Sequence, residues 1–132
     1  MIETTLLQTW YDEVWNNANE SFINKMLHSG ARIHGLQTDH AKSGSEAFLP
    51  FYKNFREQFP TVQVELEPIF SGEGFEAARC NVKATHASGK QVAFSGITIA
   101  KFADGKLVEG WNGFDFLDMY QQLGYKLVDE NV

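Results

Sequence analysis

The sequence predicts an α+β fold in which N-terminal helices cover one face of a curved, mostly antiparallel sheet. Two periodicities predict it. Up to Pro60, apolar residues recur at every third or fourth position, as they do in amphipathic helices. After Pro60 the period falls to two, which is typical of strands with one buried face. Glycine-containing stretches separate the alternating segments, so these segments can be joined as hairpins.

The N-terminal half begins with a strongly amphipathic helix. Leu6, Trp10 and Val14 recur every four residues. Three more apolar residues widen the stripe: Leu7, Tyr11 and Trp15. Such a stripe predicts a helix that buries one face. A short second helix is expected over 21–28, where apolar residues again share a face, and Gly30 supplies its end.

A brief strand over 31–36 and a long aromatic helix are expected next. Ser43 and Glu46 have the spacing of a capping box at the start of a helix. Aromatic residues then follow at helical intervals up to Pro60: Phe48, Phe51, Tyr52, Phe55 and Phe59. Pro50 lies within this segment, so it implies either a kink or a start later than the capping box indicates.

The remaining alternating segments are expected to be strands, over 62–70, 78–84, 91–102 and 107–116. The short glycine-containing turns between them favour antiparallel pairing. A last helix is expected over 117–123, with Asp115 as its N-cap and Gly124 as its end.

The turn before the last strand sets the register of that strand. A three-residue loop with its glycine in the left-handed region would pair Phe102 with Lys106. In that register Thr98 lies beside Gly110 and diagonal to Asn112, so all three share one face of the sheet. A two-residue turn would shift this register by one residue, so Thr98 and Asn112 would no longer share a face.

Asn112 is an unexpected residue on an inward face. Alternation places mostly apolar residues on that face: Val108, Gly110, Asn112, Phe114 and Phe116. The other face carries Leu107, Glu109, Trp111, Gly113 and Asp115. An amide left unpaired in an apolar interior costs about 1–3 kcal/mol. The protein's own groups, ordered water or a ligand should therefore satisfy Asn112.

Composition narrows the class of protein. The chain has 132 residues, a net charge of −6 and no basic face for phosphate groups, which argues against nucleic acid binding. Cys80 is the only cysteine, so no disulfide framework is expected. No apolar run approaches the roughly 20 residues needed to cross a bilayer, and the N-terminus lacks the pattern of a secretory signal. Residues 1–132 are therefore expected to form one soluble, cytoplasmic domain.

Four segments carry a resemblance to a known family: "EVWNNAN", "FREQFP", "FSGITIAKFADGKLVEGWN" and "YQQLG". With the order of the elements, they resemble the SnoaL-like polyketide cyclases of the nuclear transport factor 2-like superfamily. The resemblance covers nearly the whole chain and is strongest over 94–124. It implies a cone-shaped fold, often dimeric, with a deep apolar pocket between the concave face of the sheet and the helices. It also implies ring closure by proton transfer at an activated carbon, without metal or cofactor.

The chain departs from this family at the expected catalytic positions. In active cyclases the residue after the strand tryptophan is usually an aspartate that acts as general acid and base, and here it is Asn112. Those enzymes can also carry a histidine two residues after the Ser-Gly pair, and here it is Thr98. An amide does not exchange protons near neutral pH. His34 matches a histidine common in the first strand of the family, so it is expected either to face the pocket or to bond a neighbouring carbonyl. Asn112 and His34 are the candidate catalytic residues.

The resemblance also implies which residues would line a ligand pocket. These are Trp10, Val14, Trp15, Phe51, Phe94, Thr98, Asn112 and Phe114. Aromatic residues at helical spacing are also typical of a plain core. His28, His34 and His40 are six residues apart, which does not place two of them on one helical face as a zinc pair requires. Neither a metal site nor a cofactor is expected.

Three functions remain open from the sequence. In the first, the chain is an enzyme that acts on a small apolar carbonyl compound, with His34 or a tyrosine in place of the lost acid. Alternatively, it is a binding protein whose pocket holds an apolar ligand with Asn112 as the polar anchor. Thirdly, it is an interaction module, and this is compatible with either of the others. Ile97, Ile99 and Trp111 on the outward face of the sheet predict a homodimer through that face.

Overall fold

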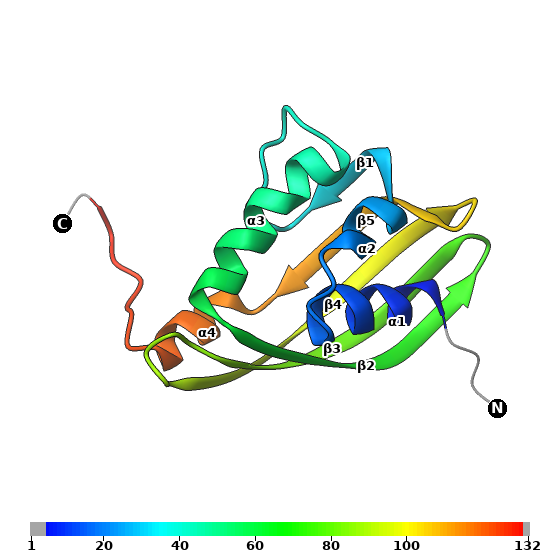
Figure 1. Ribbon diagram of the computed structural model, residues 1–132. Coiled ribbons are helices and arrows are strands. Elements are labelled where there is room, and N and C mark those ends of the chain that lie inside the picture. The colour runs from blue at the N-terminus through cyan, green and yellow to red at the C-terminus, as the bar shows by residue number, and fades with distance from the viewer. Residues whose placement is uncertain (1–4, 131–132) are drawn as a thin grey trace.

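The computed structural model describes residues 5–130, in which five strands form one curved sheet with helices on one of its faces (Figure 1). The strands are β1 (Leu27–His34), β2 (Thr61–Gly72), β3 (Phe75–Thr85), β4 (Gln91–Ala103) and β5 (Lys106–Phe114). Their order across the sheet is β1-β5-β4-β3-β2. β1 pairs with β5 in parallel, and every other pair is antiparallel. The predicted α+β fold with a mostly antiparallel sheet is confirmed.

The helices are α1 (Leu6–Trp10), its π-helical continuation η1 (Tyr11–Asn16), α2 (Ser21–Met26), α3 (Gly44–Gln58) and α4 (Phe116–Gln122). The first four lie on the same side of the sheet, and α4 lies at one end of the sheet beside β4 (Figure 1). Between residues 5 and 130, no helix is long and apolar enough to cross a membrane.

The end of η1 is held by the long helix α3. The Tyr52 hydroxyl donates to the carbonyl oxygen of Val14 at 2.8 Å, and Arg56 Nη1 donates to that of Trp15 at 3.2 Å. Both carbonyls belong to the last turn of the helix, where intrahelical partners run out. These bonds fix the wider π-helical turn against α3 and bury the side chains of Val14 and Trp15.

Asn16 connects the same helix to the edge of the sheet. Its Nδ2 donates to the Val64 carbonyl at 2.9 Å, and its Oδ1 accepts from the Val64 amide at 2.6 Å. The side-chain amide therefore pairs with edge strand β2 as a neighbouring strand would. Gln122 of α4 does the same for Ala93 of β4, at 2.8 and 2.9 Å. These contacts fix where the helices sit above the sheet.

The second helix is shorter than expected. α2 ends at Met26 and β1 begins at Leu27, so His28 lies in a strand rather than in a helix. Leu27 pairs with Leu107 of β5. Pairing with a distant strand thus overrides the local helical period.

The long helix starts where the capping box indicated and runs through its proline. α3 begins at Gly44 and continues past Pro50, so the later start is wrong. The Ser43 hydroxyl does not cap the helix but donates to the Ser29 carbonyl at 2.8 Å. A Cβ on Gly44, whose φ is +56°, would lie 2.8 Å from that same carbonyl oxygen. Only glycine lets the helix begin this close to β1.

The hairpin between β4 and β5 turns through two residues rather than three. Asp104 and Gly105 have positive φ values of 53° and 77°, and Ala103 pairs with Lys106. Two-residue turns with this geometry match the right-handed twist of the strands, and Asp-Gly is a preferred sequence for them. The predicted three-residue loop is therefore wrong.

A β-bulge at Val108 compensates for the shorter turn. The register shifts by one residue after Leu107, and Thr98 pairs directly with Asn112 rather than with Gly110. Because the bulge restores the alternation, Thr98 and Asn112 share the inward face, as expected. Leu107, expected on the outward face, is instead buried inside.

Candidate functional site

An apolar cavity lies between the concave face of the sheet and the helices α1, η1 and α3. The volume that the centre of a water molecule can occupy inside it is about 70 Å³. One bound water requires roughly 10–15 Å³ of such space. Except for Val14, every residue expected to line a pocket does line this cavity: Trp10, Trp15, Phe51, Phe94, Thr98, Asn112 and Phe114. Val14 is fully buried in the core.

Partly exposed residues line one side of the cavity and mark its mouth. They come from β1 and the loop after it, from α3, from the end of β5 and from the start of α4: Ile33, Leu36, Phe51, Phe55, Phe114 and Phe116. The ring centroids of Phe55 on α3 and Phe116 at the start of α4 are 6.5 Å apart, so α3 and α4 approach each other at this side.

Aromatic rings form much of the wall. Trp15 packs edge-on against Phe51 and Phe55, with ring centroids 6.3 and 5.5 Å apart. Phe94 of β4 packs edge-on against Phe114 of β5 at 6.3 Å. Edge-to-face packing holds each ring in place, so the apolar wall is preformed.

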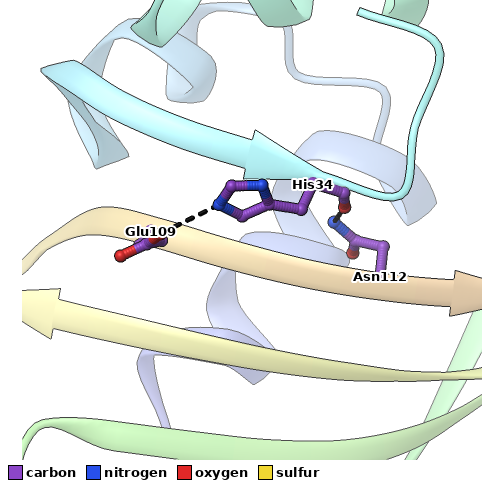
Figure 2. Close-up of polar contacts among 3 residues, drawn as sticks. All are labelled: His34, Glu109 and Asn112. Carbon is purple, nitrogen blue, oxygen red and sulfur yellow. Dashed lines mark hydrogen bonds and ion pairs between the residues drawn. The ribbon is translucent and has the colours of Figure 1, made fainter.

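Asn112 is satisfied by the protein's own groups. Its Oδ1 accepts from the Thr98 hydroxyl at 3.1 Å. Its Nδ2 donates to the carbonyl oxygen of His34 at 3.0 Å, as Figure 2 shows. The amide therefore ties the end of β1 to β5 while it lines the cavity. These two bonds use one of its two N–H groups and one of the two lone pairs on Oδ1.

Tyr11 is a polar cavity residue that was not among the expected pocket residues. Its buried hydroxyl makes side-chain hydrogen bonds with Thr98 and Cys80. Burial raises the pKa of Tyr11 well above its usual value, and the neighbouring Cys80 raises it further, whereas the Thr98 bond acts in the opposite direction. Burial also raises the pKa of Cys80 to about 11. Both groups are neutral at physiological pH. The signal in the sequence that could have indicated a polar cavity residue was a hydroxyl on an otherwise apolar stripe.

His34 does not reach the cavity. Its Nε2 lies 2.8 Å from Glu109 Oε2 (Figure 2). Its ring stacks on Trp111 with centroids 5.7 Å apart. His34 pairs with Trp111 in the ladder of β1 and β5, and paired residues face the same side of a sheet. The inward position on β1 belongs to Ile33. Only the His34 backbone contacts Asn112, so the expectation of a pocket-facing imidazole is wrong.

A family model supports the resemblance seen in the sequence. The model for SnoaL-like polyketide cyclases matches residues 5–123. This chain belongs to the SnoaL-like polyketide cyclase family. No curated protein matches the sequence at a significant level.

Solved structures share the fold of this SnoaL-like protein. A putative polyketide cyclase from Acidithiobacillus ferrooxidans has a TM-score of 0.81 at 22% identity, over 94% of this chain and 98% of that chain. A putative polyketide cyclase from Bacillus cereus has a TM-score of 0.77 at 29% identity, over 90% of this chain and 78% of that chain. A putative hydroxylase from Streptomyces galilaeus has a TM-score of 0.71 at 24% identity, over 89% of this chain and 83% of that chain. The shared fold thus carries more than one described activity.

The SnoaL-like cavity contains few groups that can move a proton. Within residues 5–130, no Asp, Glu, His, Lys or Arg side chain lines it. The polar lining comes from Tyr11, Thr98 and Asn112, which donate and accept hydrogen bonds without changing charge near neutral pH. The described residues also contain no cluster of three or more His, Cys, Asp and Glu side chains that could hold a metal ion. The arrangement can bind and orient an apolar molecule with one polar group.

Proposed function

We propose that this SnoaL-like protein binds a small, mostly apolar carbonyl compound in the cavity, with Asn112 as the polar anchor. Concave sites lined by apolar and aromatic groups, with a few placed polar groups, are typical of small-molecule binding. The aromatic wall would hold the apolar body of the ligand, and the amide would donate to its carbonyl oxygen. We further propose that aldol-type turnover is slow or absent.

The observation that carries this proposal is the amide at position 112. Asn112 lines the cavity, and the resemblance implies an aspartate at this position in active cyclases. No Asp, Glu, His, Lys or Arg side chain of residues 5–130 lines the cavity in its place. General acid–base catalysis by one group is typically worth about 10²–10⁴-fold. An amide preserves the hydrogen bonds of the position but not its proton exchange.

Family membership supports a second candidate, a cofactor-independent cyclase or isomerase. In this case another group would have to exchange the proton. Tyr11 reaches the cavity with a hydroxyl, but its raised pKa keeps it protonated, so it would act as a donor rather than as a base. Binding without turnover is therefore the function that the lining favours.

The two candidates are separated by assaying binding and turnover on the same panel of small polyketide-like ketones and esters. The proteins are the unmodified chain, Asn112→Ala and, as a matched control on an exposed part of α2, Asn24→Ala. We expect binding by the unmodified chain and by Asn24→Ala, weaker binding by Asn112→Ala, and no appreciable turnover. Robust turnover that survives Asn112→Ala would contradict the proposal, because catalysis would then lie elsewhere.

We also propose that the outer face of the sheet forms a homodimer interface. Ile97, Ile99 and Trp111 are 51%, 42% and 37% exposed. Ile99 pairs with Trp111 across β4 and β5, and Phe75 stacks on Trp111 at 6.5 Å between centroids, so the apolar surface is continuous. Exposed patches of this kind usually mark interfaces. A two-fold dimer would bury this same patch on both protomers.

Sedimentation at high micromolar concentration tests this interface. The unmodified protein is expected to be a dimer and Ile99→Lys a monomer. Val128→Lys, which changes a 74% exposed residue outside the sheet, is the matched control and should remain dimeric. A monomeric unmodified protein would rule the interface out.

A further inference from the structure

A second pocket, lined mostly by polar side chains, is formed by the end of β1, the loop after it and α3. The volume that the centre of a water molecule can occupy inside it is about 40 Å³. One bound water requires roughly 10–15 Å³ of such space, so the pocket has room for a small group of several heavy atoms. Its polar lining consists of Arg32, His34, Thr38, Asp39, His40 and Lys42.

The segment that forms most of this pocket is basic, although the chain as a whole is acidic. The protein has a net charge of −6, yet residues 28–42 contain three of the four histidines, one arginine, one lysine and a single acidic residue, Asp39. The pocket is far smaller than the extended basic face that a nucleic acid requires. It instead concentrates positive charge at the scale of one small anion.

The protein itself does not neutralise the cationic groups of the pocket. Between residues 5 and 130, no hydrogen bond or ion pair engages the side chains of Arg32, His40 and Lys42. All three residues are exposed, so their donors remain available to a ligand.

The acidic groups beside the pocket are held by other partners. Glu109 is next to Arg32 in the ladder of β1 and β5, but its Oε2 lies 2.8 Å from His34 Nε2 (Figure 2). Asp39 lines the pocket, and its Oδ1 accepts from the Ala41 amide at 2.9 Å. The arginine and the lysine of the pocket therefore outweigh the one carboxylate in its lining.

We propose that this pocket binds a phosphate group through Arg32, His40 and Lys42. A guanidinium matches two phosphate oxygens at once, and an ammonium acts as a compact point charge. An imidazole and the hydroxyl of Thr38 supply two further donors from the same lining. A phosphate dianion has enough charge and acceptor oxygens to use all four groups, whereas a carboxylate has only two oxygens for them.

Ile33 connects the phosphate pocket to the apolar cavity, because it lines both. Leu36 of the cavity mouth and Thr38 of the phosphate pocket also lie close together in the same loop. The bound phosphate is thus either a free anion or the head group of a ligand whose apolar body lies in the cavity. The phosphate pocket itself does not depend on the function proposed for the cavity.

A titration with inorganic phosphate at constant ionic strength tests the pocket, with the backbone amide signals of residues 32–47 followed by NMR. The variants are Arg32→Ala and Lys42→Ala, and the second changes only a loop residue outside the sheet. Lys53→Ala is the matched control, because it removes one exposed positive charge from α3 and does not line the pocket.

We expect these amide signals to shift in a saturable way in the unmodified protein and in Lys53→Ala. Each pocket variant should lose about threefold to tenfold in phosphate affinity, as expected for a charge-assisted hydrogen bond at a partly exposed site. Shifts that do not saturate, or pocket variants that bind phosphate as tightly as the unmodified chain, would overturn the proposal.

The same titration with n-hexyl phosphate distinguishes the two sources of the phosphate group. A head group predicts that hexyl phosphate binds at least about tenfold tighter than inorganic phosphate and also shifts the amide signals of Thr98 and Asn112, because its methylenes are buried in the cavity. A free anion predicts equal affinities and shifts confined to residues 32–47. Either result supports the phosphate pocket. Hexyl phosphate that shifts only the cavity signals would contradict it.

Discussion

Replacing Asn112 by Asp should make the stability of the protein depend on pH in a defined direction. The substitution keeps the shape of the side chain but replaces Nδ2, which donates to the His34 carbonyl at 3.0 Å, by an oxygen. An ionised carboxylate would face that carbonyl with no proton between them. A protonated carboxyl would donate to it and accept from Thr98 through its other oxygen. The folded protein therefore favours the protonated form, and the apolar walls act in the same direction, so the pKa of the new carboxyl is raised.

The magnitude follows from the hydrogen bond at stake. Leaving a buried acceptor without its donor costs about 1–3 kcal/mol. The unfolded-state pKa of an aspartate is about 3.9. A group whose pKa is raised on folding binds more protons in the folded state, so its contribution is present below about pH 4 and is lost as the pH rises through the folded-state pKa. Relative to the unmodified protein, Asn112→Asp should lose little stability near pH 4 and about 1–3 kcal/mol at pH 7.

Urea unfolding of both proteins from pH 4 to pH 8 measures this difference directly. Asn24→Asp places the same charge change on an exposed surface and should show no such trend. A difference between Asn112→Asp and the unmodified chain that does not vary with pH would refute the reasoning. So would a variant that gains relative stability as the pH rises.

Three further predictions concern the groups around Asn112. Thr98→Val should lower the free energy of unfolding by about 1–3 kcal/mol in urea titrations, because Tyr11 and Asn112 each lose a partner. The unmodified protein should lose stability above about pH 9, because Cys80, with a pKa of about 11, and Tyr11 ionise more readily when unfolded. Cys80→Ala should flatten this loss between about pH 9 and 11 in thermal melts. His34→Ala should change ketone affinity by less than about twofold in a titration, because the imidazole lies on the outer face.

The fold was predictable because its signals are local. The change of period at Pro60 separates helices from strands, and the alternation in the last strand places Asn112 on the inward face with the apolar residues. The N-cap at Asp115 was also predictable, because a cap requires only that residue and its near neighbours. Its side chain accepts from the Asp118 amide at 3.0 Å, as a cap should.

The errors arose where distant segments decide the structure. The face of His34 depends on pairing between β1 and β5, which are far apart in the sequence. The register of β4 and β5 depends on a bulge at Val108 that compensates for a two-residue turn, and alternation alone does not reveal such a pair of features. Tyr11 was left out of the expected pocket residues because its hydrogen-bond partners lie on other elements. In each case the deciding partner is far away along the chain.

Proton exchange of a bound ketone tests the central claim most directly. Acetophenone in D2O reports binding through saturation transfer from the protein and proton transfer through the loss of its methyl signal. The unmodified protein is predicted to show saturation transfer with no exchange above the buffer rate. Asn112 binds the carbonyl, no Asp, Glu, His, Lys or Arg side chain of residues 5–130 lines the cavity, and the raised pKa of Tyr11 keeps its hydroxyl protonated. Fast exchange by the unmodified protein, or no saturation transfer at all, would contradict the account.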